Sequence, residues 1–129
     1  MRRQLWTIKA GLYRSVRSLP GLAGILESEN RAVRNLLEQI PGDSTWRVLD
    51  AGTGRGNGLS LLKSEFDHLY AMDFSRRMLR KTHPGYPDTN YAVADVGSMP
   101  HRDSVFDLVT CIGVAEYVPD FAALLSEIH

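Results

Sequence analysis

Clustered glycines and a carboxylate are the residues of this sequence whose spacing points most directly to chemistry. Residues 48–56, VLDAGTGRG, place Asp50, Gly52, Gly54 and Gly56 directly after an apolar run. Glycine loses more conformational freedom on folding than other residues, so three of them at alternate positions require a geometric cause. Either the backbone makes a tight turn or a ligand approaches it closely. Because a turn alone seldom needs three glycines, the spacing favours a ligand-binding loop.

The dinucleotide fingerprint G-x-G-x-x-G is the main alternative, and the loop does not match it. A match that starts at Gly52 requires glycine where Asn57 stands. A match that starts at Gly54 requires glycine where Leu59 stands. The carboxylate of Asp50 repels phosphate and attracts a cation. The loop therefore favours a cationic ligand over a pyrophosphate.

Strand-like and helix-like segments alternate from residue 46 onward. Short apolar runs predict strands over 46–52, 68–74, 90–96 and 105–114. Helical spacing of apolar residues predicts helices over 57–66, 76–83 and 119–128. Ser75 stands where a hydroxyl caps a helix, and Asp120 stands where a negative charge suits a helix start. The alternation predicts an α/β fold with a doubly wound, mainly parallel sheet.

The first 45 residues follow a different pattern. Apolar residues at helical spacing predict helices over 4–18 and 22–40, and PGDST at 41–45 predicts a turn. We therefore expect an N-terminal helical extension, residues 1–45, before an α/β domain, residues 46–129. Ligands of open α/β sheets bind beyond the carboxyl ends of the strands, where the glycine-rich loop begins.

These segments together resemble the class I S-adenosylmethionine-dependent methyltransferases of the small-molecule type. The resemblance covers most of residues 46–121 and rests on four segments in order: VLDAGTGRG, YAMDFSRRMLRKT, VADVGSMPHRDSVFDLVTC and GVAEYVPD. It implies a Rossmann-like fold, S-adenosyl-L-methionine as the cofactor, and methyl transfer to a small-molecule acceptor. Such a transfer is an in-line displacement, so the protein acts mainly by positioning the reactants.

The resemblance assigns the glycine-rich loop and the second strand to the cofactor. Gly52 and Gly54, with Gly56 in the same loop, would let the backbone lie against the methionine and ribose parts. Asp50 would organise the loop and face the amino acid end, whose ammonium favours a carboxylate. Asp73 would accept hydrogen bonds from the ribose hydroxyls. The alternative for Asp73 is a role in capping the next helix.

The same resemblance assigns residues from the third and fourth strands. Asp95 would bind the adenine amino group, with capping of the next element as its alternative. Phe74 and Val96 would line the adenine ring, although Phe74 also suits an ordinary core position. Cys111 and Ile112 would border the sulfonium and the substrate. No basic residue flanks Cys111, so we expect a small apolar contact and not a nucleophile.

The sequence does not identify a catalytic residue, and no metal ligand is expected. Tyr117 stands where many relatives carry histidine, but a phenol with a pKa near 10 is a poor base at neutral pH. We interpret Tyr117 as a pocket wall. The four histidines, His68, His83, His101 and His129, show no spacing typical of a metal site.

The composition limits which classes of partner and which location we expect for the protein. The 129 residues carry no formal net charge, so attraction to nucleic acid or to an anionic membrane is not indicated. No apolar run reaches the roughly 20 residues that span a bilayer. The single cysteine and the lack of a signal-like N-terminus favour a cytoplasmic location.

The end of the sequence leads to a further expectation. Relatives continue with a fifth strand and an antiparallel pair, whereas this sequence stops at His129. Since a bare fourth strand exposes backbone groups, we expect a second copy of the chain, as in a dimer, or the N-terminal helices to cover it. In relatives such helices also cover the crevice, which would make residues 1–45 a lid; a solvated basic helix is equally compatible.

Three functions therefore remain open. The first is an active small-molecule methyltransferase. The second is a cofactor-binding module or pseudoenzyme that an oligomer or a partner completes. The third keeps the fold but binds a decarboxylated relative of the cofactor, as aminopropyl transferases do. The carboxylate of Asp50 argues mildly against a neutral ligand.

Overall fold

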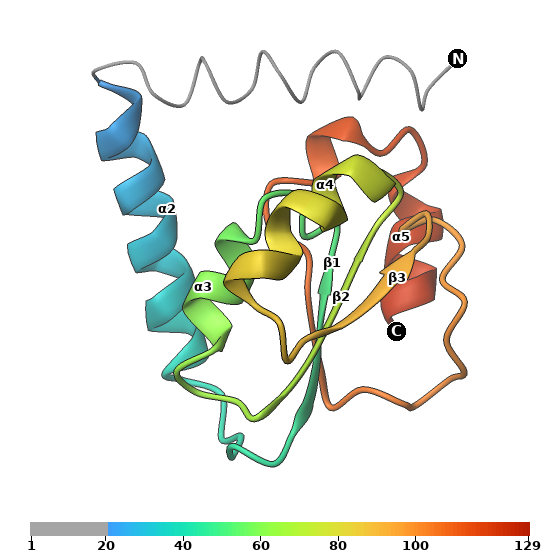
Figure 1. Ribbon diagram of the computed structural model, residues 1–129, viewed down its shortest axis with the longest axis horizontal. Coiled ribbons are helices and arrows are strands. Elements are labelled where there is room, and N and C mark those ends of the chain that lie inside the picture. Colours follow the sequence, from blue (N-terminus) through green and yellow to red (C-terminus); the bar gives the residue numbers. More distant parts are fainter. Residues whose placement is uncertain (1–20) are drawn as a thin grey trace. The chain divides into compact units, whose positions relative to one another are not determined.

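The computed structural model describes residues 21–129, and these divide between residues 42 and 43 into two units, the second of which is Asp43–His129. The predicted helix over 4–18 lies outside the described residues. In the first unit, helix α2 spans Leu22–Leu37 and has no buried residue (Figure 1). It ends earlier than the predicted residue 40. Pro41 follows, and a proline disfavours helical backbone at the residue before it.

Four parallel strands form the sheet of the second unit (Figure 1). They are β1 (Arg47–Ala51), β2 (His68–Asp73), β3 (Asn90–Val93) and β4 (Leu108–Thr110), in the order β3-β2-β1-β4. β1 pairs with β2 on one side and with β4 on the other, so it lies at the centre of the sheet. This arrangement confirms the predicted α/β fold with a doubly wound, parallel sheet.

Short helices connect the strands. They are α3 (Asn57–Leu62), α4 (Arg76–Thr82), η1 (His83–Gly85), η2 (Ala115–Tyr117) and α5 (Phe121–Ile128). The Ser75 hydroxyl accepts a hydrogen bond from the Met78 N–H at 3.4 Å, and Asp120 accepts one from the Ala123 N–H at 2.9 Å. Both residues therefore cap helices, as the sequence predicted for Ser75.

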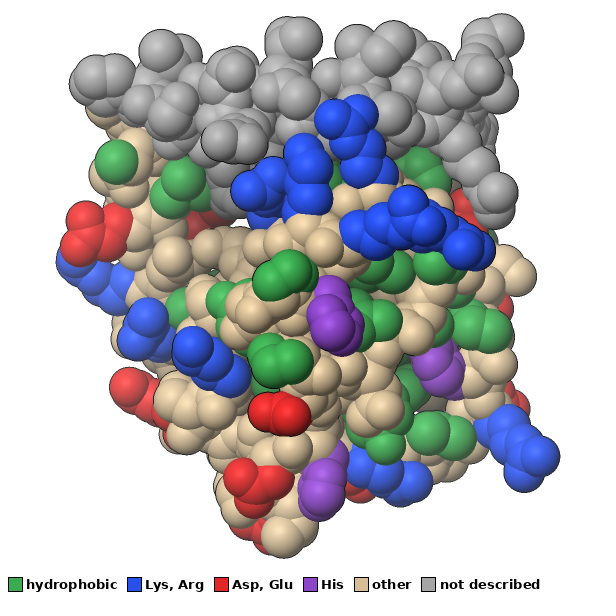
Figure 2. Space-filling model, viewed as in Figure 1, with side chains coloured by type: hydrophobic (Ala, Val, Ile, Leu, Met, Phe, Trp, Pro, Cys, Tyr) green, Lys and Arg blue, Asp and Glu red, His purple; other side chains and the backbone are tan. Residues whose placement is uncertain are grey.

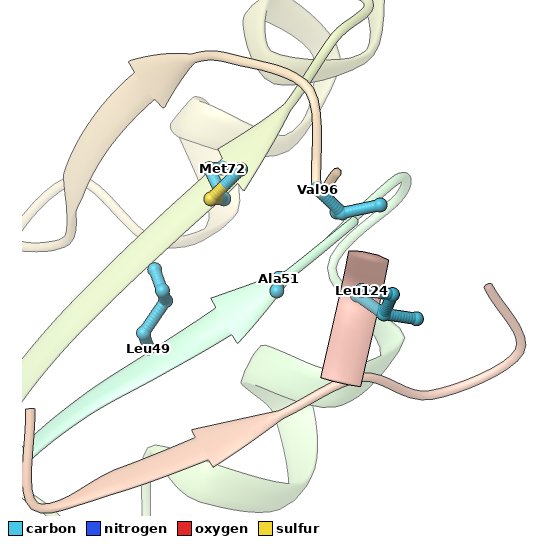
Figure 3. Packing of buried hydrophobic residues seen from close by; sticks show 5 residues of the cluster. All are labelled: Leu49, Ala51, Met72, Val96 and Leu124. Carbon is cyan, nitrogen blue, oxygen red and sulfur yellow. The ribbon is translucent and has the colours of Figure 1, made fainter. Parts of the chain in front are cut away.

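A buried apolar cluster holds α5 against the sheet. Its members are Leu49, Ala51, Met72, Val96 and Leu124 (Figure 3). Leu49 and Ala51 lie on either side of Asp50 in β1, whose side chain lies against Gly58 of α3. Since successive side chains of a strand point to opposite faces, α5 and α3 cover opposite faces of the sheet.

β4 is much shorter than the predicted strand over 105–114. Its three residues pair with Val48, Leu49 and Asp50 of β1, and no other strand of the described residues pairs with it. Beyond Thr110 the chain leaves the sheet, and Gly113 has a φ of +67°. What covers the outer edge of β4 stays a prediction.

Within residues 21–129, none of the helices combines the length and the apolar character that crossing a membrane requires.

Two neighbouring leucines of α5 provide a test of the packing. Leu124 is 2% exposed and Leu125 is 52% exposed. We expect Leu124→Ala to lower the free energy of unfolding by about 2–5 kcal/mol, because it leaves a cavity in the cluster. Leu125→Ala, as the matched control, should change it by roughly 0.5 kcal/mol or less. Urea unfolding measures both; equal losses would contradict this account of the core.

Candidate functional site

The loop after β1 crosses the carboxyl ends of two neighbouring strands. The N–H groups of Gly52 and Thr53 donate to the Met72 carbonyl of β2 at 2.8 and 2.9 Å. Gly52, Gly54 and Gly56 have φ values of +76°, +52° and +84°. This left-handed region strongly favours glycine, so the alternate spacing follows from the backbone path.

The three glycines have different surroundings. A Cβ atom at Gly52 would lie 2.5 Å from Cγ2 of Val114, and one at Gly56 would lie 2.8 Å from Thr82 and from the Tyr86 ring. At Gly54 the nearest atom is a backbone oxygen at 3.9 Å. Gly52 and Gly56 therefore accommodate other parts of the protein. Only at Gly54 does the loop leave room for a ligand to approach the backbone.

Asp73, at the end of β2, ties the loop to α4. Its Oδ2 accepts a hydrogen bond from the Gly54 N–H at 2.9 Å, and its Oδ1 accepts one from the Ser75 N–H at 2.8 Å. Burial raises the pKa of Asp73, while these two hydrogen bonds oppose the rise. The bond to Ser75 closes a turn immediately before α4, the helix that Ser75 caps. Each carboxylate oxygen keeps a further lone pair for a ligand hydroxyl.

Asp50 is buried beneath the loop, with 2% of its surface exposed. Its Oδ1 accepts a hydrogen bond from the Thr110 hydroxyl at 2.9 Å. Its Oδ2 and the buried hydroxyl of Thr53 have no hydrogen-bond partner among the described residues. No Lys, Arg or His among these residues forms an ion pair with Asp50. The site thus holds a buried carboxylate without a cation.

The environment of Asp50 shifts its titration. Burial raises the pKa of Asp50 above its ordinary value of 3.8, and the charge of Asp73 adds to the rise. The hydrogen bond from Thr110 and the nearby hydroxyl of Thr53, which does not reach hydrogen-bond geometry, act in the opposite direction. A ligand that brings a positive charge would relieve both the burial cost and the repulsion between the two carboxylates.

The remaining predicted residues lie at the same edge of the sheet but differ in exposure. Asp95 is exposed, and its Oδ1 accepts a hydrogen bond from the Gly97 N–H at 2.8 Å. The side chain of Val96 belongs to the buried cluster (Figure 3). Phe74 is half-buried and does not belong to this cluster. Ile112 is likewise half-buried. Of these, Val96 has its side chain committed to the core.

Cys111 follows β4 and packs against the buried cluster. Burial, followed by the charge of Asp50, raises the pKa of the Cys111 thiol to about 11. A thiol with this pKa stays protonated at neutral pH, and the thiolate is the nucleophilic form. The structure therefore supports a small apolar contact here.

Sequence reasoning missed the residues that hold the predicted ones in place. Thr53 and Thr110 surround Asp50, Val114 packs on Gly52, and Gly58 lies against the Asp50 carboxylate. A glycine inside a helix, which costs stability relative to alanine, was the one available signal for Gly58. The threonines gave none, because threonine is ordinary at a strand end.

The raised pKa of Asp50 predicts that the ligand-free protein loses stability as the pH rises from about 4 toward neutrality. The unfolded chain ionises this carboxyl at its ordinary pKa of 3.8, whereas burial resists ionisation in the folded chain. Asp50→Asn cannot ionise, so we expect a flatter pH profile and a Tm several degrees higher at pH 7. Tm measured from pH 4 to 8 tests this, with the exposed Asp88→Asn as the control. Parallel profiles for wild type and Asp50→Asn would refute it.

Comparison with known proteins places the chain in a family. The family model described as "Methyltransferase domain" matches residues 49–129. The trans-aconitate 2-methyltransferase of Azoarcus sp. is 32% identical over 104 residues, covering 79% of this chain and 41% of that protein. The malonyl-[acyl-carrier protein] O-methyltransferase of Salmonella typhimurium is 30% identical over 94 residues, covering 73% of this chain and 38% of that protein. The chain thus spans about two fifths of the length of these relatives.

Solved structures share the fold. CalS10, an amino pentose methyltransferase from Micromonospora echinaspora whose structure has S-adenosylmethionine bound, superposes with a TM-score of 0.66 at 21% identity. The match covers 93% of this chain and 48% of that one. The sequence motifs, the strand order and these matches agree. The chain belongs to the class I S-adenosylmethionine-dependent methyltransferase family.

Proposed function

We propose that the protein binds S-adenosyl-L-methionine at the loop between β1 and α3 and transfers its methyl group to a small-molecule acceptor. Family membership supports this function. The observation that supports it most directly is the hydrogen bond from the Gly54 N–H to Asp73. It joins a buried carboxylate to the one of the three loop glycines that has open space around it. Domain 46–129 would hold the cofactor, and residues 1–45 would act as a helical lid.

The described residues fit this cofactor. Asp50 offers a buried oxygen without a partner to a ligand that carries an ammonium and a sulfonium. The free lone pairs of Asp73 suit the two hydroxyls of a ribose. Asp95, whose Oδ1 is engaged by Gly97, would use Oδ2 for the adenine amino group. Phe74 would contact the ring, as would the backbone at Val96.

Positioning is the contribution that these residues make to the reaction. When bound, the cofactor supplies a methyl group on a sulfonium, which is already an activated leaving group. Asp50 would face the amino acid end of the ligand and Asp73 its ribose, beside the Gly54 N–H that donates to Asp73. Val114 fills the space at Gly52. Together with Cys111 and Ile112, it would border the reacting centre and exclude water. Such orientation supplies a large part of a rate enhancement.

The acceptor that fits best bears a carboxylate. Neither Cys111, with a pKa of about 11, nor Tyr117, with a phenol, is suited to remove a proton at neutral pH. A carboxylate oxygen is a nucleophile without losing a proton. Trans-aconitate, which the name of the Azoarcus relative gives, is a carboxylate.

Surface charge supports an anionic acceptor. Figure 2 shows Lys and Arg side chains gathered where α4 lies. The exposed cations of this helix are Arg76, Arg77, Arg80 and Lys81. The helix starts three residues after Asp73, so these cations stand close to the proposed site and would attract an anion toward it.

The outer edge of β4 carries a second part of the proposal. β4 pairs with β1 alone among the described strands, and Phe121 and Leu125 of α5 are about half exposed. A second copy of the chain, a partner or the N-terminal helices would cover this edge. Light scattering after size exclusion distinguishes a homo-oligomer from a monomer. The predicted cytoplasmic location belongs to the same proposal.

Cofactor binding and turnover test the function. We expect isothermal titration calorimetry to detect S-adenosylmethionine binding, and Asp73→Ala to weaken it by about 10–100-fold, since hydrogen bonds to a charged group are lost. Asp88→Ala, which removes an exposed carboxylate, is the control. Formation of S-adenosylhomocysteine with a panel of small carboxylates measures transfer.

The outcomes separate the alternatives. Turnover with a carboxylate supports the enzyme. Binding without turnover for any acceptor supports the cofactor-binding module or pseudoenzyme. Tighter binding of decarboxylated S-adenosylmethionine would favour the aminopropyl transferase alternative. A folded protein that binds neither compound would refute the proposal.

A further inference from the structure

Gly58 in the first turn of α3 lies against the carboxylate of Asp50. A Cβ atom built at Gly58 would stand 2.5 Å from both carboxylate oxygens and 2.6 Å from their carbon. Real Cβ atoms essentially never approach other atoms so closely. The Asp50 carboxylate therefore occupies the space that a side chain at position 58 would fill.

Backbone conformation does not explain this glycine. Gly58 is buried and lies within a helix, and it is absent from the glycines with positive φ. Alanine has the higher helix propensity, so glycine is the poorer choice for α3 itself. Neither a turn nor a helix end requires it. Space for Asp50 is the remaining reason for a glycine here.

Thr110 fixes the same carboxylate from β4. Its hydroxyl donates to Oδ1 of Asp50 at 2.9 Å, and both residues are buried. Residues of α3 and β4 thus contact Asp50 from two sides. Its Oδ2 has no hydrogen-bond partner among residues 21–129. Two contacts far apart in the sequence define one position for this carboxylate.

We propose that Gly58 and Thr110 are positioning residues that hold the Asp50 carboxylate ready for the ammonium group at the amino acid end of the cofactor. The inference rests on the proposed function, because it assigns Asp50 to that ligand. Gly58 acts by leaving space, and Thr110 acts through its hydroxyl. The three atoms that a Cβ atom at position 58 would meet first all belong to the Asp50 side chain, so a side chain there displaces the carboxylate.

The affinities of two ligands distinguish an effect on the position of Asp50 from a general effect on the fold. S-adenosylhomocysteine carries the amino acid end, whereas 5′-methylthioadenosine shares the adenosine part and lacks that end. We expect Gly58→Ala in the full-length protein to weaken S-adenosylhomocysteine binding about 10-fold. Binding of 5′-methylthioadenosine should change less than about twofold. Calorimetry measures both affinities.

Matched variants complete the experiment. Gly85→Ala is the control, because a Cβ atom there meets nothing within 4 Å. Thr110→Val keeps the shape of the side chain and removes the hydroxyl, so it should show the same ligand selectivity as Gly58→Ala. In an Asp50→Ala background, Gly58→Ala should cause no further loss, since the clash is gone. This double variant also remains informative if Gly58→Ala alone fails to fold.

Each result decides one question. The positioning role would be overturned if Gly58→Ala and Thr110→Val weakened the binding of both ligands equally, or weakened the binding of neither. Binding of the ligands by the wild-type protein would still uphold the proposed function in that case. An additive loss in the Asp50→Ala background would overturn it as well. A folded wild-type protein that binds neither ligand would refute the proposed function itself, and the positioning role with it.

Discussion

The hydrogen bonds of one buried carboxylate, Asp73, connect the parts of the candidate site. It accepts from the Gly54 N–H of the loop and from the Ser75 N–H at the start of α4. The loop after β1, the end of β2 and the helix after β2 therefore meet at a single side chain. Charge-assisted hydrogen bonds are stronger than neutral ones, and burial shields them from water. Without Asp73, nothing in the described chain joins Gly54 to α4 except the Thr82 hydroxyl, which donates to the Gly54 carbonyl at 2.7 Å.

The buried carboxylate of Asp50 lowers the stability of the ligand-free protein. Its carboxylate is buried near that of Asp73 and forms no ion pair with a Lys, Arg or His of the described residues, and burial raises the pKa of both groups. Such a group stabilises a complex with a cation more than it stabilises the free protein. A ligand of this site that carries a positive charge would offset this cost in stability.

The fold was largely predictable because its signals are local. Apolar runs gave the four strands, and Ser75 marked the start of α4. The glycine spacing marked the loop. Strand ends were harder: β4 pairs only with Val48, Leu49 and Asp50 of β1, and the extent of such pairing is not visible in the sequence of one strand alone. Helix α2 ended early through the proline at 41, which local rules do describe.

Site residues were predictable as positions and not as contacts. Asp50 and Asp73 were found through their places after strands, but Thr110 is 60 residues from Asp50, and the bond between them exists only in the folded sheet. For the same reason, the sequence did not predict that the Val96 side chain packs with Leu124 of α5. Contacts between residues that are far apart in the sequence produce no periodic pattern from which they could be predicted.

The glycine-rich loop has a consequence for how such chains diverge. Gly52 and Gly56 are needed by Val114, Thr82 and Tyr86 whether or not a ligand ever binds. A descendant that abandoned its ligand would still be selected to keep them. Position 54, with open space and a φ that asparagine also adopts, is free to drift once binding is lost. Among homologues, that middle position would report retained binding better than the glycines on either side.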